Sequence, residues 1–179
     1  LLPTFNVVIH VLEALGYAHG QGIVHRDIKP DNILLSRRSP AKAHAKITDF
    51  GLHRAISMSD GKPSSVLNYW KVNEAPDHKG GDIANPFGDM YQMTGGTGSV
   101  MYMAPEVMQK APYNEKVDVF AFGVVLYEVF SGILLRNLYI PDKDRGSGYR
   151  RYATRVNSGW RPPLPVEWPE ELSIIVSDC

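Results

Sequence analysis

The chain has 179 residues, of which 44% are hydrophobic and 21% are charged, an ordinary balance for a globular protein or for a piece of a larger one. Its 19 basic and 19 acidic residues give a net charge of zero, which excludes bulk charge as a reason to bind nucleic acid or an anionic membrane. The single cysteine, Cys179, excludes a disulfide framework and a cysteine metal site, and it favours a reducing, cytoplasmic location.

The first half of the sequence predicts a helix, a hairpin and a loop. Apolar side chains recur at three- and four-residue intervals over residues 4–19, which predicts a helix. Two short β-like runs, at 32–36 and 44–50, are separated by polar residues and predict a small hairpin. From about Leu52 to Gln92 the apolar rhythm fails and Gly, Pro, Ser, Asp and Asn accumulate, so we expect a long mobile loop there.

The second half contains a helix that is apolar on almost every side, at residues 115–131. Such a helix is either the centre of a domain or a membrane span. Asp118 and Glu128 lie inside it, and each acidic residue costs roughly 2–3 kcal/mol near the centre of a membrane helix, so we predict a core helix. Two amphipathic helices follow, at 148–159 and 169–179, joined by "WRPPLPVEWP", which we interpret as a rigid connector rather than a polyproline ligand.

Three short motifs follow one another in a fixed order. "HRDIKPDN" places Asp27 five residues before Asn32, "DFG" begins at Asp49, and "APE" ends at Glu106. The predicted hairpin lies between the first two motifs, and the predicted core helix follows the third. In this combination the chain resembles the eukaryotic protein kinases. The resemblance covers essentially the whole chain, but only the larger, C-terminal lobe of that fold.

The resemblance implies a mainly α fold in which a small β-hairpin carries the catalytic loop. It divides residues 1–179, as a partial kinase domain, into a catalytic loop (25–33), an activation segment (49–106) with a polar insert at about 54–92, and the core helix (115–131). The family's Gly-rich loop, β3-strand lysine and final helix are missing from the sequence. Because the sequence opens and closes in mid-pattern, we expect both ends to be cuts in a longer chain, with the small N-terminal lobe upstream.

The implied function is transfer of the γ-phosphate of ATP to a Ser or Thr hydroxyl of a protein substrate. Asp27 would accept the proton of the hydroxyl, and Lys29, which is typical of the serine/threonine class, would stabilise the phosphoryl oxygens. Asn32 and Asp49 would hold Mg²⁺. Leu34, alternating inward after Asn32, would lie under the adenine ring. The stretch "TGGTGSVMYMAPEV", together with "PYNEKVDVFAFGVVLYEV" after it, is similar to the tyrosine-kinase-like branch of Ser/Thr kinases.

The resemblance also implies supporting roles. Ser99 would hold the substrate-docking loop near Asp27, and Glu106 would have its family partner in the missing final helix. Asp118 has two readings, a partner of the helix dipole and a carboxylate that binds backbone N–H groups of the catalytic loop, and we favour the second. Arg26 would pair with a phosphate on the activation segment. Its candidate sites are Ser57, Ser59, Ser64, Ser65, Thr94 and Thr97.

Two residues of the catalytic loop receive structural readings: His25 is expected to pack beneath the loop, and Asp31 to be a solvated turn residue. A non-catalytic kinase-like scaffold, or a gene fragment that acts through partner binding, remains the alternative to an enzyme. The presence together of Asp27, Lys29, Asn32 and Asp49 argues for the enzyme, since a scaffold has no need of all four.

Overall fold

The computed structural model of the protein describes residues 2–50, 54–55, 58–59, 62–63, 99–140 and 145–179. Its helices are α1 (Leu2–Gly20), α4 (Pro105–Met108), α5 (Lys116–Ser131), α6 (Leu135–Tyr139), α7 (Arg145–Asn157) and α8 (Glu170–Asp178). Its 3-10 turns are η1 (Pro30–Asn32), η2 (Pro40–Lys42) and η4 (Ser99–Tyr102). Its strands form antiparallel pairs: β1 (Ile23–Val24) with β4 (Arg54–Ala55), β2 (Ile33–Leu35) with β3 (Ala45–Ile47), and β5 (Met58–Ser59) with β6 (Lys62–Pro63).

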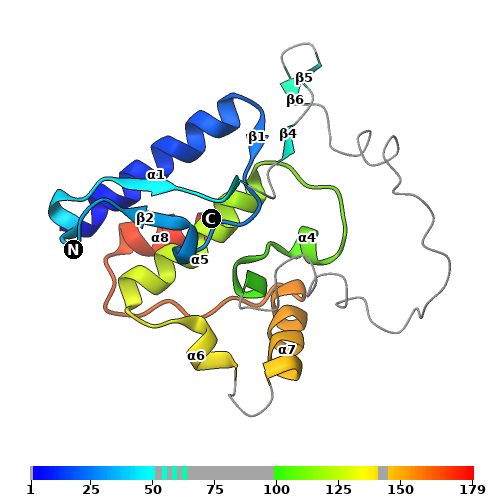
Figure 1. Cartoon of the computed structure of the whole chain (residues 1–179). Coiled ribbons are helices and arrows are strands. Elements are labelled where there is room, and N and C mark those ends of the chain that lie inside the picture. Colours follow the sequence, from blue (N-terminus) through cyan, green and yellow to red (C-terminus); the bar gives the residue numbers. More distant parts are fainter. Residues whose placement is uncertain (1, 51–53, 56–57, 60–61, 64–98, 141–144) are drawn as a thin grey trace.

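Helix α5 lies at the centre of the fold, with α1 and the β2–β3 hairpin on one side and α6 and α7 on the other (Figure 1). One apolar cluster joins α1 to α5 through Val11, Leu15 and Phe122. A second joins α5 to α7 through Tyr127, Tyr152 and Val156. A helix that packs on two sides must be apolar on two sides, so the prediction of a core helix is confirmed. Among the described residues, no helix is long and apolar enough to cross a membrane.

The predicted hairpin is present, in the register Ile33↔Ile47 and Leu35↔Ala45. The expectation that Leu34 points inward is wrong, because its side chain is 54% exposed. Side chains alternate along a strand, and here Ile33 and Ile47 are the residues that pack against the α1–α5 cluster. Leu34 is therefore an apolar side chain on the open face of the hairpin.

Part of the predicted loop at Leu52–Gln92 forms short strands, and there the expectation of irregular structure is wrong. Arg54–Ala55, which the sequence assigned to the insert, pair with Ile23–Val24 directly before the catalytic loop. A strand of two residues has no measurable apolar period, so its backbone pairing leaves no signal in the sequence. The rest of the predicted loop lies outside the described residues.

Gly123 in α5 lies close to Cys179, the residue that follows α8. A Cβ built on Gly123 would lie 2.5 Å from the Cβ of Cys179, whereas one built on Gly16, exposed in α1, meets no atom within 4 Å. We expect Gly123→Ala to lower the free energy of unfolding by about 1–3 kcal/mol through overpacking. The matched Gly16→Ala variant is expected to raise it by about 0.5–1 kcal/mol. Urea unfolding followed by circular dichroism measures both, and shifts of the same sign would contradict the prediction.

Candidate active site

Four predicted site residues share one hydrogen-bond network: Asp27, Lys29 and Asn32, which lie between β1 and β2, and Ser99, the first residue of η4. Lys29 Nζ donates to Asp27 Oδ2 (2.6 Å) and to Ser99 Oγ (3.0 Å). Asn32 Nδ2 donates to the Asp27 backbone oxygen (2.7 Å) and to Asp27 Oδ2 (3.0 Å). One carboxylate oxygen of Asp27 is thus fixed by a cation and an amide. The other, Oδ1, accepts no hydrogen bond from the described residues, which leaves it available to a bound hydroxyl.

The short turn η1 explains how Asn32 returns to Asp27. Pro30 occupies its first position, where a fixed φ suits the turn and no backbone N–H is needed. The Asn32 backbone N–H donates to the Lys29 carbonyl (3.0 Å), which closes the turn. Asp31, at the outside of the turn, is exposed, as expected for a solvated residue.

His25 is fully buried beneath the loop. Its Nδ1 accepts from the Asp27 backbone N–H (3.2 Å), so its Nε2 carries the proton that is donated to the Thr48 carbonyl (2.9 Å). Its ring contacts Phe50 edge-on, with centroids 4.6 Å apart. Because both ring nitrogens are engaged, His25 acts as a packing residue and not as a second base, which confirms the sequence interpretation.

Asp118, which has no solvent exposure, binds the backbone of the catalytic loop. Its Oδ2 accepts from the His25 N–H (2.8 Å) and from His19 Nε2 (2.9 Å), and its Oδ1 accepts from the Arg26 N–H (2.7 Å). Of the two readings of Asp118, the structure contains the contacts of the second. Arg26 has a φ of 73°, a left-handed conformation that costs a non-glycine residue about 1–3 kcal/mol. The Asp118 carboxylate helps hold it there.

Asn32 and Asp49 lie close together because β2 and β3 bring their ends side by side. The Thr48 N–H donates to the Asn32 carbonyl (2.9 Å). Asp49 follows Thr48 in the sequence, so its backbone lies near Asn32. The side-chain nitrogen of Asn32 donates to Asp27, so the side-chain oxygen of Asn32, Oδ1, points away from Asp27. This Asn32 oxygen accepts no hydrogen bond from the described residues. An amide oxygen and a carboxylate are hard ligands. Mg²⁺ is typically held by one or two such groups together with phosphates and water, so this pair fits the ion.

The other predicted residues lie apart from this network. Leu34 is on the open face of β2, and Glu106 is half-buried in the first turn of α4, where its carboxylate makes no ion pair with any described residue. The Arg26 guanidinium lies over the ring of Tyr113, 5.5 Å from its centroid. The candidate phosphorylation sites between Ser57 and Thr97 lie outside the part of the chain whose side chains are described.

A protein-family comparison matches the protein kinase domain to residues 4–155. The chain belongs to the protein kinase family. A probable serine/threonine-protein kinase of Dictyostelium discoideum is 31% identical over 97% of the chain, and the serine/threonine-protein kinase VIK of Arabidopsis thaliana is 35% identical over 74%. The calcium/calmodulin-dependent protein kinase type II of Caenorhabditis elegans is 33% identical over 96%. The matches cover 14%, 25% and 19% of these relatives, so the chain spans at most a quarter of their length.

Sequence reasoning assigned no role in this kinase site to His19, Tyr102 or Glu128. Glu128 carried a usable signal, because an acidic residue inside an apolar helix needs a buried partner, as Asp118 does. The signal does not identify the partner. Tyr102 donates from its hydroxyl to Glu128 Oε2 (2.7 Å), across 26 residues of sequence.

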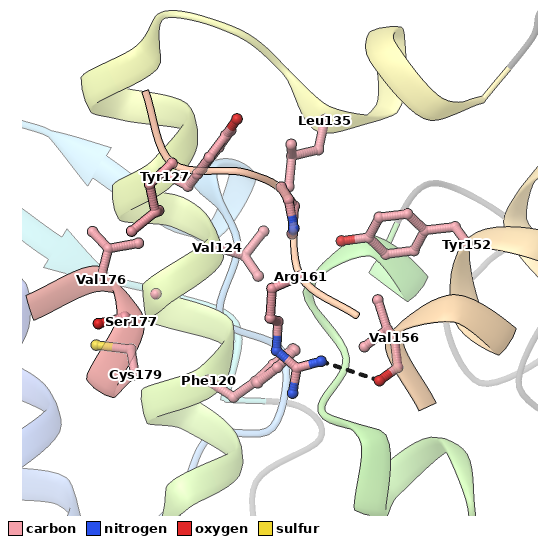
Figure 2. Close-up of a pocket in the computed structure, with 13 residues that line it drawn as sticks. Phe120, Val124, Tyr127, Leu135, Tyr152, Val156, Arg161, Val176, Ser177 and Cys179 are labelled. Carbon is pink, nitrogen blue, oxygen red and sulfur yellow. Dashed lines mark hydrogen bonds between the residues drawn. The ribbon is translucent and has the colours of Figure 1, made fainter. Parts of the chain in front are cut away.

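A cavity of about 210 Å³ lies away from the kinase motifs, between α5, α7 and α8 (Figure 2). Its walls are mostly apolar and include Phe120, Val124 and Val176. Its cation, Arg161, donates from Nη1 to the Val156 carbonyl (3.0 Å). None of the predicted site residues lines it. A cavity of about 20 Å³ lies at the catalytic loop, lined in part by Arg26, Asp27 and Ser99.

Proposed function

We propose that the full-length protein transfers the γ-phosphate of ATP to serine or threonine hydroxyls of protein substrates, and that the described residues supply its catalytic centre. The network of Asp27, Lys29, Asn32 and Ser99 carries this proposal. It holds a carboxylate and an ammonium group 2.6 Å apart on rigid neighbours, as general-base catalysis with charge stabilisation requires. Membership of the protein kinase family and the Ser/Thr kinases among the relatives support the reaction class.

Each residue of the network has a proposed role. Asp27 orients the substrate hydroxyl and accepts its proton on Oδ1, while Lys29, aligned by Asp27 and Ser99, stabilises the charge on the transferred phosphoryl group. Asn32 and Asp49 hold Mg²⁺, which neutralises phosphate charge when bound. The exposed Leu34 offers an apolar surface for the adenine ring. Ser99 keeps the substrate-docking loop at the same centre.

The domain assignment is part of the proposal. We infer that residues 1–179 form the helical C-terminal lobe, and that a Gly-rich loop and a strand lysine outside this sequence cover ATP, since neither motif occurs in it. Leu34 is exposed on the open face of the hairpin, and this supports the proposal that the small N-terminal lobe packs on that face. The run "TGGTGSVMYMAPEV" supports the tyrosine-kinase-like branch. The percentage of identical residues does not help to choose a branch of the kinase family. It is 35% for the Arabidopsis thaliana relative and 33% for the Caenorhabditis elegans relative, which is nearly the same.

Three residues have proposed structural or regulatory roles. Asp118 holds the backbone of the catalytic loop, and Glu106 stabilises the end of the activation segment. Arg26 is the proposed partner of a phosphate on that segment, because it directly precedes Asp27 and keeps a costly backbone conformation.

The single cysteine supports a reducing, cytoplasmic compartment.

Removal of the metal tests the function. We expect the full-length protein to label a generic Ser/Thr protein substrate from γ-labelled ATP, and chelation of Mg²⁺ by EDTA to reduce the label to background. The reason is that two protein oxygens hold Mg²⁺ only together with the phosphates of ATP. Excess Mg²⁺ should restore the labelling, and phosphoamino-acid analysis should find the label on Ser or Thr. Absence of both transfer and nucleotide binding would favour a scaffold, and transfer that resists EDTA would contradict the metal assignment.

A further inference from the structure

The end of the β2–β3 hairpin carries a concentration of positive charge. No acidic residue occurs between Asp31 and Asp49, whereas four basic residues do, and we call these four the basic hairpin end: Arg37, Arg38, Lys42 and Lys46. They are four of the 19 basic residues of the chain, which leaves 15 basic against 19 acidic residues elsewhere and a net charge of −4 there. A total charge of zero therefore conceals a cationic hairpin end on an anionic remainder.

The charges of the basic hairpin end are not paired within the part of the chain that the structure describes. All four side chains are exposed, and none forms an ion pair with a described residue. Glu13, the one acidic residue in the sequence of the neighbouring helix α1, forms no such pair either. Like charges that are held close together repel one another, and no acid among the described residues offsets that repulsion. The arrangement thus suits an anion from outside the fold.

The backbone that carries these charges is held in place. The Ser36 N–H donates to the His44 carbonyl (2.9 Å), and the His44 N–H donates to Ser36 Oγ (2.9 Å), so the two ends of the loop are joined. The His44 ring stacks on that of His10 in α1, with centroids 5.1 Å apart, and Ala43, directly after η2, is buried. The loop lies beside the N-terminal half of α1 (Figure 1). A partner therefore meets a loop whose backbone is already ordered, which lowers the entropy cost of binding.

The surroundings of these charges favour a short acidic peptide over a nucleic acid or a membrane. Residues 36–44 contain no Phe, Tyr or Trp, on which the bases of a single strand stack, and no large apolar side chain that inserts into a membrane. A long nucleic acid or a membrane surface also extends beyond the hairpin end, where the remaining net charge of −4 repels it. A short peptide contacts the hairpin end alone.

We propose that the basic hairpin end is a docking surface for a short segment of a partner protein that is rich in Asp or Glu. A carboxylate accepts paired hydrogen bonds from a guanidinium group, so Arg37 and Arg38 supply the strongest contacts. Asn32 and Asp49 lie at the opposite end of the hairpin, about 10 Å away along strands of three residues. The docked segment therefore leaves the catalytic loop open, and the inference does not depend on phosphoryl transfer.

The test measures the binding of a fluorescein-labelled oligo-glutamate peptide to the full-length protein by fluorescence anisotropy. In the double variant Arg37→Gln, Arg38→Gln we expect the Kd to rise about three- to tenfold, because two exposed ion pairs are lost. Raising NaCl from about 50 to about 300 mM should weaken wild-type binding as well, since salt screens exposed charges. An oligo-glutamine peptide of the same length should not bind. The kcat for a generic Ser/Thr substrate should stay at the wild-type value, because neither arginine belongs to the catalytic hydrogen-bond network.

The double variant Arg150→Gln, Arg151→Gln is the matched control, since it removes two adjacent, exposed arginines from α7 and changes the net charge by the same amount. Its Kd for the peptide should lie within about twofold of wild type, because distant charges are screened. Absence of peptide binding, an unchanged Kd in the hairpin variant, or an equal rise of Kd in both variants would overturn the inference.

Two further probes test the class of partner. Tighter binding of poly(U) RNA or of phosphatidylserine vesicles than of the peptide, weakened by Arg37→Gln, Arg38→Gln, would also overturn the inference, because the hairpin end would then recognise nucleic acid or membrane. Each of these results leaves the proposed kinase function standing. A wild-type protein that binds the peptide but transfers no phosphate would refute the kinase function and leave the docking surface standing.

Discussion

The Asp27→Asn variant of the full-length kinase is expected to lose roughly 10²–10⁴ in kcat for phosphoryl transfer. An amide cannot accept the proton of the substrate hydroxyl, although it keeps the size of the carboxylate. Lys29 also loses the anion that lies 2.6 Å from its Nζ, so its alignment weakens. The KM for ATP should change little, because the proposed metal ligands are untouched. Steady-state transfer to a Ser/Thr protein substrate at saturating Mg²⁺ measures the effect.

The control for this experiment is Asp31→Asn, the same substitution four residues later. Asp31 is exposed at the outside of η1, so its replacement should leave the free energy of unfolding within about 0.5 kcal/mol of wild type and kcat nearly unchanged. A similar loss of kcat in both variants would show that the negative charge of the loop matters, and not Asp27 in particular. A kcat of Asp27→Asn within a fewfold of wild type would refute the assignment of Asp27 as the base.

Asp118→Ala is expected to give the largest loss of stability among the proposed substitutions, about 3–5 kcal/mol in the free energy of unfolding. The carboxylate accepts three hydrogen bonds at 2.7 to 2.9 Å without solvent exposure, so its removal leaves buried N–H groups unsatisfied. The left-handed Arg26 also loses a contact that holds its backbone. Activity should therefore fall even at temperatures where the variant remains folded. Urea unfolding and kcat measured well below the melting temperature separate the two effects.

Asp118→Asn supplies an intermediate case. It keeps one acceptor oxygen and the side-chain volume, so we expect a smaller loss of about 1–3 kcal/mol. A stability of Asp118→Ala within about 0.5 kcal/mol of wild type would show that water or a backbone shift replaces the carboxylate. In that outcome Asp118 would be a partner of the helix dipole rather than a support of the loop.

Long elements with a clear period were predictable from the sequence. The core helix predicted at 115–131 is Lys116–Ser131, and the helix predicted at 4–19 is Leu2–Gly20. The hairpin and the last helix were also found, because apolar patterning over many residues reports burial directly. The contact of Asp118 with the catalytic loop followed from the resemblance, and not from any local pattern.

Short and long-range features were not predictable. The pairing of Arg54–Ala55 with β1 involves only two residues per strand, so no period marks it. Leu34 and Ile33 are equally apolar, and only the packing of the hairpin on α1 decides which one faces outward. The partner of Glu128 is 26 residues away in a 3-10 turn, and that distance is set by tertiary structure. Each of these features depends on where another segment lies.

The position of Asp118 also bears on the order of events during folding. It lies 93 residues after His25 and 92 after Arg26, so these hydrogen bonds close a very long loop. Contacts of high sequence separation form slowly, since the chain must first lose the entropy of that loop. A nascent chain that has exposed only "HRDIKPDN" from the ribosome lacks the carboxylate that shapes this stretch. We therefore expect the catalytic loop to take up this conformation only after Asp118 has been synthesised.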